Sequence, residues 1–293
     1  MGSTWVRIDM SWAMLQPERG PIRPDSWGVQ NINKVITMAS SRGLKVLGTL
    51  WMTPAWARPS GSDERTAPSN PADYGQAFAW ATAHWSGKVQ AWEVWNEPNS
   101  TDFLTNSNPV AYTRMLCSAY SATQALPGPA GAQVVYGGTM HNDLSWIEKT
   151  YAAGAKGCFD IMATHPYQSP SNTAAMTGRG TEPWEFASLR EVRQIMARNK
   201  DYRAVWITEF GWSSHANSGN EPAWARGVTE QQQADFTVGA IKALRTNFPF
   251  VKKAFIYNDR ATVGEGTHLA GYGILNADES PKPVWHALRA YLR

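Results

Sequence analysis

Cysteine is scarce in this chain, and the two residues present, Cys117 and Cys158, belong to no metal-binding or redox motif. No CxxC pair and no cysteine–histidine cluster with zinc spacing occurs, so a cysteine-held metal centre is not expected. The pair either forms a disulfide or consists of two small side chains in the core. Because free cysteine is among the most often buried residues, we predict two buried thiols.

Long apolar runs, blocks of like charge and glycine-rich phosphate loops are also missing. No stretch approaches the roughly 20 apolar residues of a membrane span, so no such span is expected. The 27 basic and 24 acidic residues are scattered, which argues against a nucleic-acid partner. No GxGxxG fingerprint follows a strand-like run, which argues against nucleotide binding. The start of the chain shows no secretory signal, and localisation stays open, with action outside the cell or at its surface suspected.

Tryptophan, in contrast, is abundant, with 15 residues in a chain of 293. This number exceeds what a core alone requires, although core packing accounts for many of them. Flat sugar faces stack on aromatic rings, so a carbohydrate site is one reason for the excess. The 43% of hydrophobic residues is enough for a substantial core.

Seven short apolar runs alternate with amphipathic stretches of helical period. The strand-like runs are residues 5–10, 45–50, 90–95, 133–138, 159–164, 204–208 and 253–257. Strict alternation favours a parallel sheet covered by helices, and seven units favour a (β/α)8-type TIM barrel over an open sheet. No linker or repeat interrupts the chain, so we predict one domain over residues 1–293, as a monomer or as part of a larger polypeptide.

The longest irregular stretches each follow a strand. They are residues 53–71, 168–182 and 213–228, rich in Gly, Pro, Ser and Asn. Loops after strands form the reactive face of such a barrel, so we expect these three to wall a substrate cleft. Thr229, followed by Gln232, predicts a capping box at the start of the next helix.

Two carboxyl groups stand at strand ends. The sequence WEVWNEPN, residues 92–99, places Asn96 and Glu97 where one strand ends, and WITEFGW, residues 206–212, places Glu209 at the end of a later one. Glycosidic cleavage needs such a pair, one protonated to assist the departing oxygen and one ionised to attack the anomeric carbon. A separation of about 5–5.5 Å predicts retention of anomeric configuration, and about 6.5–9.5 Å predicts inversion.

These two motifs resemble those of clan A glycoside hydrolases, most of all family 39 and its relatives among bacterial exopolysaccharide glycosidases. Further similar segments follow in the right order along nearly the whole chain. They are WVRID at 5–9, TPAWA at 53–57, THPY at 164–167, and GIL at 273–275 leading to Lys282 and Pro283. The resemblance implies a retaining glycosidase that acts on an oligo- or polysaccharide or a cell-surface glycan, with Glu97 as acid/base and Glu209 as nucleophile. It implies no metal and no cofactor.

The resemblance also implies a set of substrate-binding residues. Asn96 would bind the sugar hydroxyl next to the anomeric carbon, and Arg7 would hold the nucleophile ionised. His165 and Tyr167 would line the floor near Glu209. Independently of the resemblance, aromatic rings at or after strand ends are candidates to contact sugars, and these are Trp51, Trp212 and Tyr257. The full set is Arg7, Trp51, Asn96, His165, Tyr167, Trp212 and Tyr257.

Two alternatives and one departure accompany this interpretation. The same barrel could serve a non-catalytic carbohydrate-binding or adhesion protein, or a cellulase- or mannanase-like clan A enzyme. Glu93 shares a strand face with Glu97, but it lies roughly 13 Å deeper in a regular strand, so we expect it to be a buried partner of Arg7 or of another cation. The chain also opens on what resembles the second strand of the family barrel, which predicts that the first strand–helix unit is missing.

Overall fold

Parallel strands form the centre of the computed structural model, which describes residues 2–126, 132–262, 264 and 266–292. They form two four-stranded sheets with the orders β1-β2-β3-β4 and β5-β6-β7-β8. The strands are β1 (Trp5–Ser11), β2 (Lys45–Trp51), β3 (Ala91–Val94), β4 (Gln133–Tyr136), β5 (Thr139–Met140), β6 (Met162–His165), β7 (Val205–Phe210) and β8 (Val251–Ile256). All ladders within the two sheets are parallel, and each of the seven strand-like runs overlaps a strand. The predicted α/β class with parallel strands is confirmed.

β4 and β5 are two segments of one extended stretch, separated by Gly137 and Gly138. Val135 of β4 pairs with Ile161, directly before β6, and β5 pairs with β6 itself. The strands of the described residues therefore occupy seven positions. No ladder joins β1 to β8 in this part of the chain, so closure of the barrel stays a prediction.

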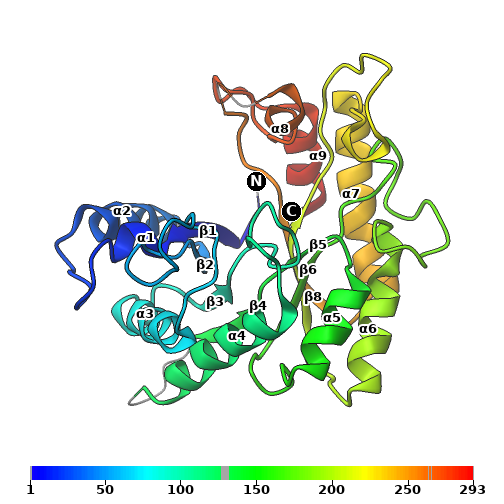
Figure 1. Ribbon diagram of the computed structural model, residues 1–293. Helices are drawn as coiled ribbons and strands as arrows, with labels where there is room; N and C mark the ends of the chain where they lie inside the picture. The colour runs from blue at the N-terminus through cyan, green and yellow to red at the C-terminus, as the bar shows by residue number, and fades with distance from the viewer. Residues whose placement is uncertain (1, 127–131, 263, 265, 293) are drawn as a thin grey trace.

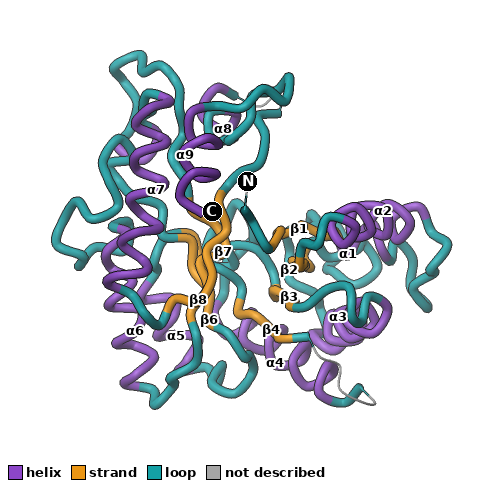
Figure 2. Tube along the Cα trace, turned by 180° about the vertical axis from the view of Figure 1, so that it is seen from behind, coloured by secondary structure: helices purple, strands orange, loops and turns teal. Residues whose placement is uncertain are grey.

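Helices cover the outside of both sheets. Figure 1 shows α1–α4 on the side of the first sheet and α5–α9 on the side of the second, and Figure 2 shows the same division from behind. The α-helices are α1 (Trp12–Leu15), α2 (Trp27–Ser41), α3 (Pro71–His84), α4 (Pro109–Gln124), α5 (Leu144–Ala152), α6 (Leu189–Arg198), α7 (Glu230–Asn247), α8 (Thr267–Ala270) and α9 (Pro283–Leu292), with short 3-10 turns η1 (Phe186–Ser188) and η2 (Ala223–Ala225). Within the described ranges no helix has the length and apolar character needed to cross a membrane.

Local sequence explains where several helices begin. α3 and α4 each follow an asparagine, Asn70 or Asn108, whose side chain accepts from backbone N–H groups of the first turn, with proline at the first helical position. α7 begins at the predicted capping box of Thr229 and Gln232, which is confirmed. Because the first residue of each of these helices is held by its cap, the end of the preceding loop is held as well. These loops connect the strand ends to the helices.

The inner faces of the strands share one core. Side chains from six strand positions, together with Trp5 of β1, pack into a single cluster, whose buried members are Leu47, Ala91, Val135, Ile161, Ala163, Trp206 and Phe255. Trp5 packs edge-on against Phe255 of β8, with ring centroids 6.3 Å apart. The strands therefore curve around a common interior, and residues at their carboxyl ends can meet above it.

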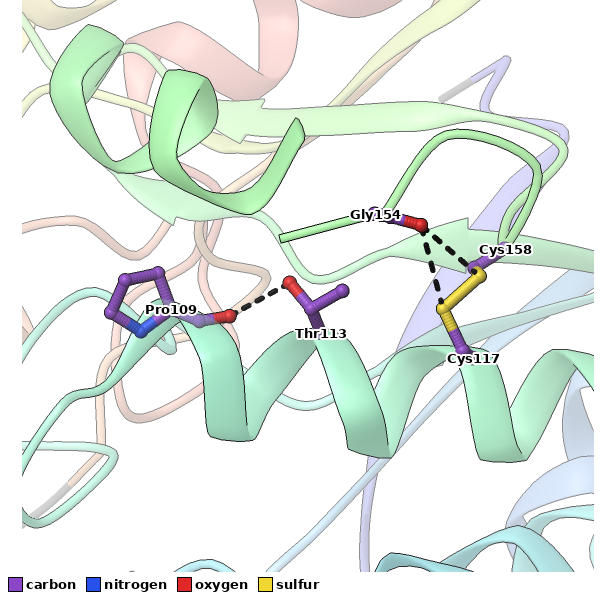
Figure 3. Close-up of a disulfide and its surroundings, with 5 residues drawn as sticks. All are labelled: Pro109, Thr113, Cys117, Gly154 and Cys158. Carbon is purple, nitrogen blue, oxygen red and sulfur yellow. Dashed lines mark hydrogen bonds between the residues drawn. A yellow bond between two sulfur atoms is a disulfide. The ribbon is translucent and has the colours of Figure 1, made fainter. Parts of the chain in front are cut away.

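The two cysteines correct a prediction. Cys117 of α4 and Cys158 of the loop before β6 form a disulfide, with Cα atoms 4.6 Å apart (Figure 3). The expectation of two separate buried thiols was wrong, because α4 packs beside the turn that leads into β6 and brings the two side chains together. The disulfide links the outer layer of the first sheet to the start of a strand in the second.

Candidate active site

Four strands and the segments that follow them bring the predicted catalytic and supporting side chains together. Arg7 lies on β1, Glu97 shortly after β3, His165 at the end of β6 and Glu209 near the end of β7. One carboxylate oxygen of each glutamate and a ring nitrogen of His165 all lie within 4.8 Å of one another. The two glutamates therefore meet in one place, although they are far apart in the chain.

Arg7 connects the acidic groups of the site through a single guanidinium. Its Nε donates to Glu93 Oε2, its Nη1 to Glu209 Oε1 and its Nη2 to Asn96 Oδ1, each at 2.7 Å. Burial alone lowers the pKa of Arg7, but nearby carboxylates, Glu93 above all, outweigh burial and raise the pKa above its usual value. Arg7 is therefore a permanent cation that fixes three side chains at once.

Both oxygens of Glu209 accept hydrogen bonds. Arg7 donates to one, and the hydroxyl of Tyr167 donates to the other at 2.9 Å. These two donors fix the plane of the carboxylate, and its side chain is still 13% exposed. A carboxylate that is oriented, paired with a cation and reachable from outside is suited to attack an electrophilic carbon.

Glu97 has a different environment. Its side chain is 7% exposed, and its Oε1 lies 2.8 Å from Nδ1 of the fully buried His165. Burial raises the pKa of Glu97, and the hydrogen bond from His165 opposes this rise without cancelling it. A carboxyl with a raised pKa keeps its proton closer to neutral pH, which is what a general acid requires.

A glycine makes room for His165. The other ring nitrogen, Nε2, lies 3.0 Å from Thr208 Oγ1. A Cβ atom at Gly138 would lie 2.2 Å from Nε2 and 2.5 Å from that hydroxyl oxygen, so any larger residue would displace the ring. The carbonyl of Gly138 also accepts a hydrogen bond from the backbone N–H of Glu97. The backbone N–H of Gly138 donates to the carboxylate of Glu93. The backbone at this position forms the floor of the site.

An irregularity in β7 turns two consecutive side chains toward the site. Neighbours in a regular strand point to opposite faces, yet Thr208 and Glu209 both contact groups of the site. The pairing of β7 with β8 shifts in register between Ile207 and Phe210. Bulges of this kind re-aim side chains and are frequent next to active sites.

Glu93 lies against the site, and the regular strand assumed for the expected depth of about 13 Å ends before Glu97, at Val94. The fully buried Glu93 shares Arg7 with Glu209. Strand spacing does not apply here, because the chain leaves β3 with a φ of +71° at Trp95 and +42° at Glu97. Burial raises the pKa of Glu93, but Arg7 and hydrogen bonds outweigh burial and lower it. Glu93 is therefore the buried partner of Arg7, as the sequence predicted.

The three predicted aromatic contacts differ in position. Trp51 is half-buried at the end of β2. Trp212 is 2% exposed and donates its indole N–H to the carbonyl of Thr173 at 2.9 Å, which favours a packing role. The half-buried Tyr257 follows β8, with its ring centroid 5.5 Å from that of Tyr272. Contact of these side chains with a sugar stays a prediction.

Sequence reasoning missed Thr208, Gly138 and Tyr272. Thr208 precedes a predicted site residue, and strand alternation assigned it to the opposite face. Gly138 ended a predicted strand, and a second glycine before it was a sign that the backbone there is crowded. Tyr272 packs edge-on against Tyr167 at 5.8 Å, and no motif marked it.

Glu97, His165 and Glu209 are also the one group in the described part of the chain whose ligand atoms are spaced closely enough to hold a metal ion. Arg7 already places a positive charge 2.7 Å from Glu209. A metal cation bound by the same carboxylate would be repelled by this guanidinium. The donor set therefore suits a pair of working carboxyls better than a cation site.

Comparison with solved structures identifies proteins of the same fold. A family 39 glycoside hydrolase from Bacteroides cellulosilyticus WH2 superposes with a TM-score of 0.76 at 23% identity, over 99% of this chain and 58% of its own. A family 39 enzyme from Xanthomonas axonopodis pv. citri gives a TM-score of 0.67 at 17% identity, over 97% of this chain and 60% of its own. Fungal β-1,4-galactanases give 0.66 at 16% identity, over 99% of this chain and 88% of their own.

No protein-family model matches the sequence, and no curated protein does. The chain spans about three fifths of the length of the two family 39 enzymes. At these identities the likeness is one of fold, and it agrees with the resemblance carried by the two glutamate motifs. The protein has the fold of a clan A, family 39-like glycoside hydrolase.

Proposed function

We propose that the protein is a retaining glycoside hydrolase that cleaves O-glycosidic bonds in a polysaccharide or cell-surface glycan. The observation that carries this proposal is the meeting of Glu97 and Glu209, with carboxylate oxygens within 4.8 Å, in two unlike environments. This closeness supports the short separation of about 5–5.5 Å that goes with retention. The solved structures of the same fold, which include a β-xylosidase and β-1,4-galactanases, support a carbohydrate substrate.

The reaction proceeds in two displacements. In the first, an oxygen of Glu209 attacks the anomeric carbon, the bond from that carbon to the leaving oxygen breaks, and Glu97 gives this oxygen its proton. In the second, Glu97 takes a proton from water, whose oxygen attacks the anomeric carbon and breaks the ester bond to Glu209. Both carboxyls return to their starting states, and the sugar keeps its configuration.

The supporting residues have defined parts in this scheme. Arg7 and Tyr167 orient the carboxylate of Glu209 for attack. Because Arg7 already binds the side-chain oxygen of Asn96, the NH2 group of Asn96 is the part that can donate to a sugar hydroxyl. We further propose that the seven strand positions are seven of the eight β/α units of the family barrel.

Replacing Glu209 by Gln tests the proposal. We expect Glu209→Gln to lower kcat at least about a thousandfold, because an amide cannot form the glycosyl ester, while glycan binding persists. Glu148→Gln, at an exposed ion pair with Arg198, is the matched control and should keep full activity. Proton NMR of the first product formed reports its anomeric configuration. Unchanged turnover in Glu209→Gln ends the nucleophile assignment, and an inverted first product ends the retaining mechanism.

A further inference from the structure

A row of aromatic rings leads from Glu209 to the protein surface. Tyr167, which donates to Glu209, packs against Tyr272 with centroids 5.8 Å apart. Tyr272 packs against His268 at 5.3 Å, and His268 against Trp224 at 5.7 Å. These rings come from the segments that follow β6, β7 and β8, so the row lies on the nucleophile side of the site.

Trp224, the outer end of this row, is an exposed ring on a fixed backbone. It is 59% exposed and belongs to η2. Ser171 donates from its N–H and its hydroxyl to the carbonyl of Ala223, and His215 Nε2 lies 3.1 Å from the carbonyl of Ala225. Trp224 is therefore a large apolar side chain presented to water from a backbone that is held by hydrogen bonds, next to the aromatic row.

Much of the Trp224 side chain stays exposed beside its contact with His268. The two ring planes meet at 84°, an edge-to-face arrangement that occupies at most one face of the indole. An uncovered indole face carries partial negative charge and is apolar. The C–H groups on the flat side of a sugar ring carry the opposite partial charge, so the two surfaces fit.

A hollow of about 430 Å³ opens beside the row. His215, whose ring packs edge-on against His268 at 5.3 Å, lies in its wall. Ser214, Thr229 and Gln232 also line the hollow, and their hydroxyl and amide oxygens take part in local hydrogen bonds as well. Hydroxyl and amide groups of this kind bind the hydroxyls of a sugar.

We propose that Trp224 stacks on a sugar residue beyond the one at Glu209, so that the protein binds a glycan chain of several sugars along this row. The inference rests on the proposed glycosidase function, and it deepens that function by assigning an extended sugar chain as the substrate class. Tyr272 and His268 connect Tyr167 to Trp224 through edge-on ring contacts.

The test compares Trp224→Ala with Trp27→Ala, a control at a somewhat more exposed tryptophan (69%) at the start of α2. The substrates are β-1,4-linked galacto-, xylo- and mannooligosaccharides from disaccharides upward, together with nitrophenyl monoglycosides. We expect Trp224→Ala to lower kcat/KM by about two- to tenfold on the longer chains, with the loss growing with chain length. Trp27→Ala should match the wild type at every length.

A binding measurement separates this inference from the proposed function. In the Glu209→Gln background, adding Trp224→Ala should weaken oligosaccharide binding by the same factor in calorimetry, without any turnover. Equal chain-length profiles and equal affinities for the two tryptophan variants would overturn the subsite. A wild-type protein that cleaves none of these glycans would instead end the glycosidase proposal, and the binding comparison would still decide whether Trp224 contacts sugar.

Discussion

The two sheets hold the two glutamates in opposite ways. Glu97 follows a strand of the first sheet and is held by His165 of the second, whereas Glu209 belongs to the second sheet and is held by Arg7 of the first. Each carboxyl is thus held by at least one side chain from the other sheet. The partners differ in kind, because Arg7 is a permanent cation and His165 is an imidazole that can gain or lose a proton. This contrast gives two identical side chains the different characters that the proposed reaction needs.

Replacing Arg7 should have the largest effect on the difference in environment between the two glutamates. We expect Arg7→Met to lower the free energy of unfolding by about 3–5 kcal/mol, because the buried Glu93 then lacks its cation. Turnover should fall about a hundred- to thousandfold, since Glu209 and Asn96 lose the donor that orients them. Urea unfolding and kcat measure the two effects.

A second substitution separates the two effects of Arg7. Adding Glu93→Gln to Arg7→Met should restore part of the stability, because no unpaired charge stays buried, and should leave turnover low. If the single variant is as stable and active as the wild type, Arg7 does not organise the site.

The disulfide offers a way to loosen the boundary between the sheets without touching the glutamates. Replacing Cys117 and Cys158 by Ser should lower the free energy of unfolding by about 2–4 kcal/mol, since the bond closes a loop of substantial length in the unfolded chain. Cys158 precedes β6, at the opposite end of that strand from His165. We therefore expect kcat at 25 °C to stay within about twofold of wild type, as for surface changes in general.

Reduction of the wild-type protein provides the control. Dithiothreitol should shift the urea midpoint of the wild type toward that of the double variant and leave the midpoint of the variant unchanged. A large loss of activity in the variant would show that the boundary between the sheets positions the glutamates.

The sequence predicted those parts of the molecule that depend on short-range pattern. Apolar runs identified the strands, and the strand ends placed Glu97 and Glu209 at one edge, because parallel strands share a direction. The disulfide could not be predicted, since its formation depends on how α4 packs beside a distant turn. Thr208 was missed because a bulge in β7 overrides the alternation of side chains. Contacts between distant segments and local departures from regular strand geometry were thus the features that the sequence did not predict.

A substitution at Thr208 should have the smallest effect on the difference in environment between Glu97 and Glu209. The Thr208 hydroxyl lies 3.0 Å from Nε2 of His165 and also hydrogen-bonds the carboxylate of Glu93, which leaves the hydroxyl oxygen to accept from the ring. Thr208→Val removes this partner and leaves a buried nitrogen without one. We expect a stability loss of about 1–3 kcal/mol and a fall in kcat of roughly tenfold.

The pH profile distinguishes this positioning role from a merely structural one. Activity should fall on the alkaline side as Glu97 loses the proton that it donates to the leaving group. Burial raises the pKa of Glu97, and donation from His165 opposes the rise. A ring without its Thr208 partner donates less well, so the alkaline limb of kcat/KM should move to higher pH in Thr208→Val and return in Thr208→Ser, which keeps the hydroxyl. An alkaline limb that stays in place while stability falls would mean that Thr208 supports the fold and leaves Glu97 unaffected.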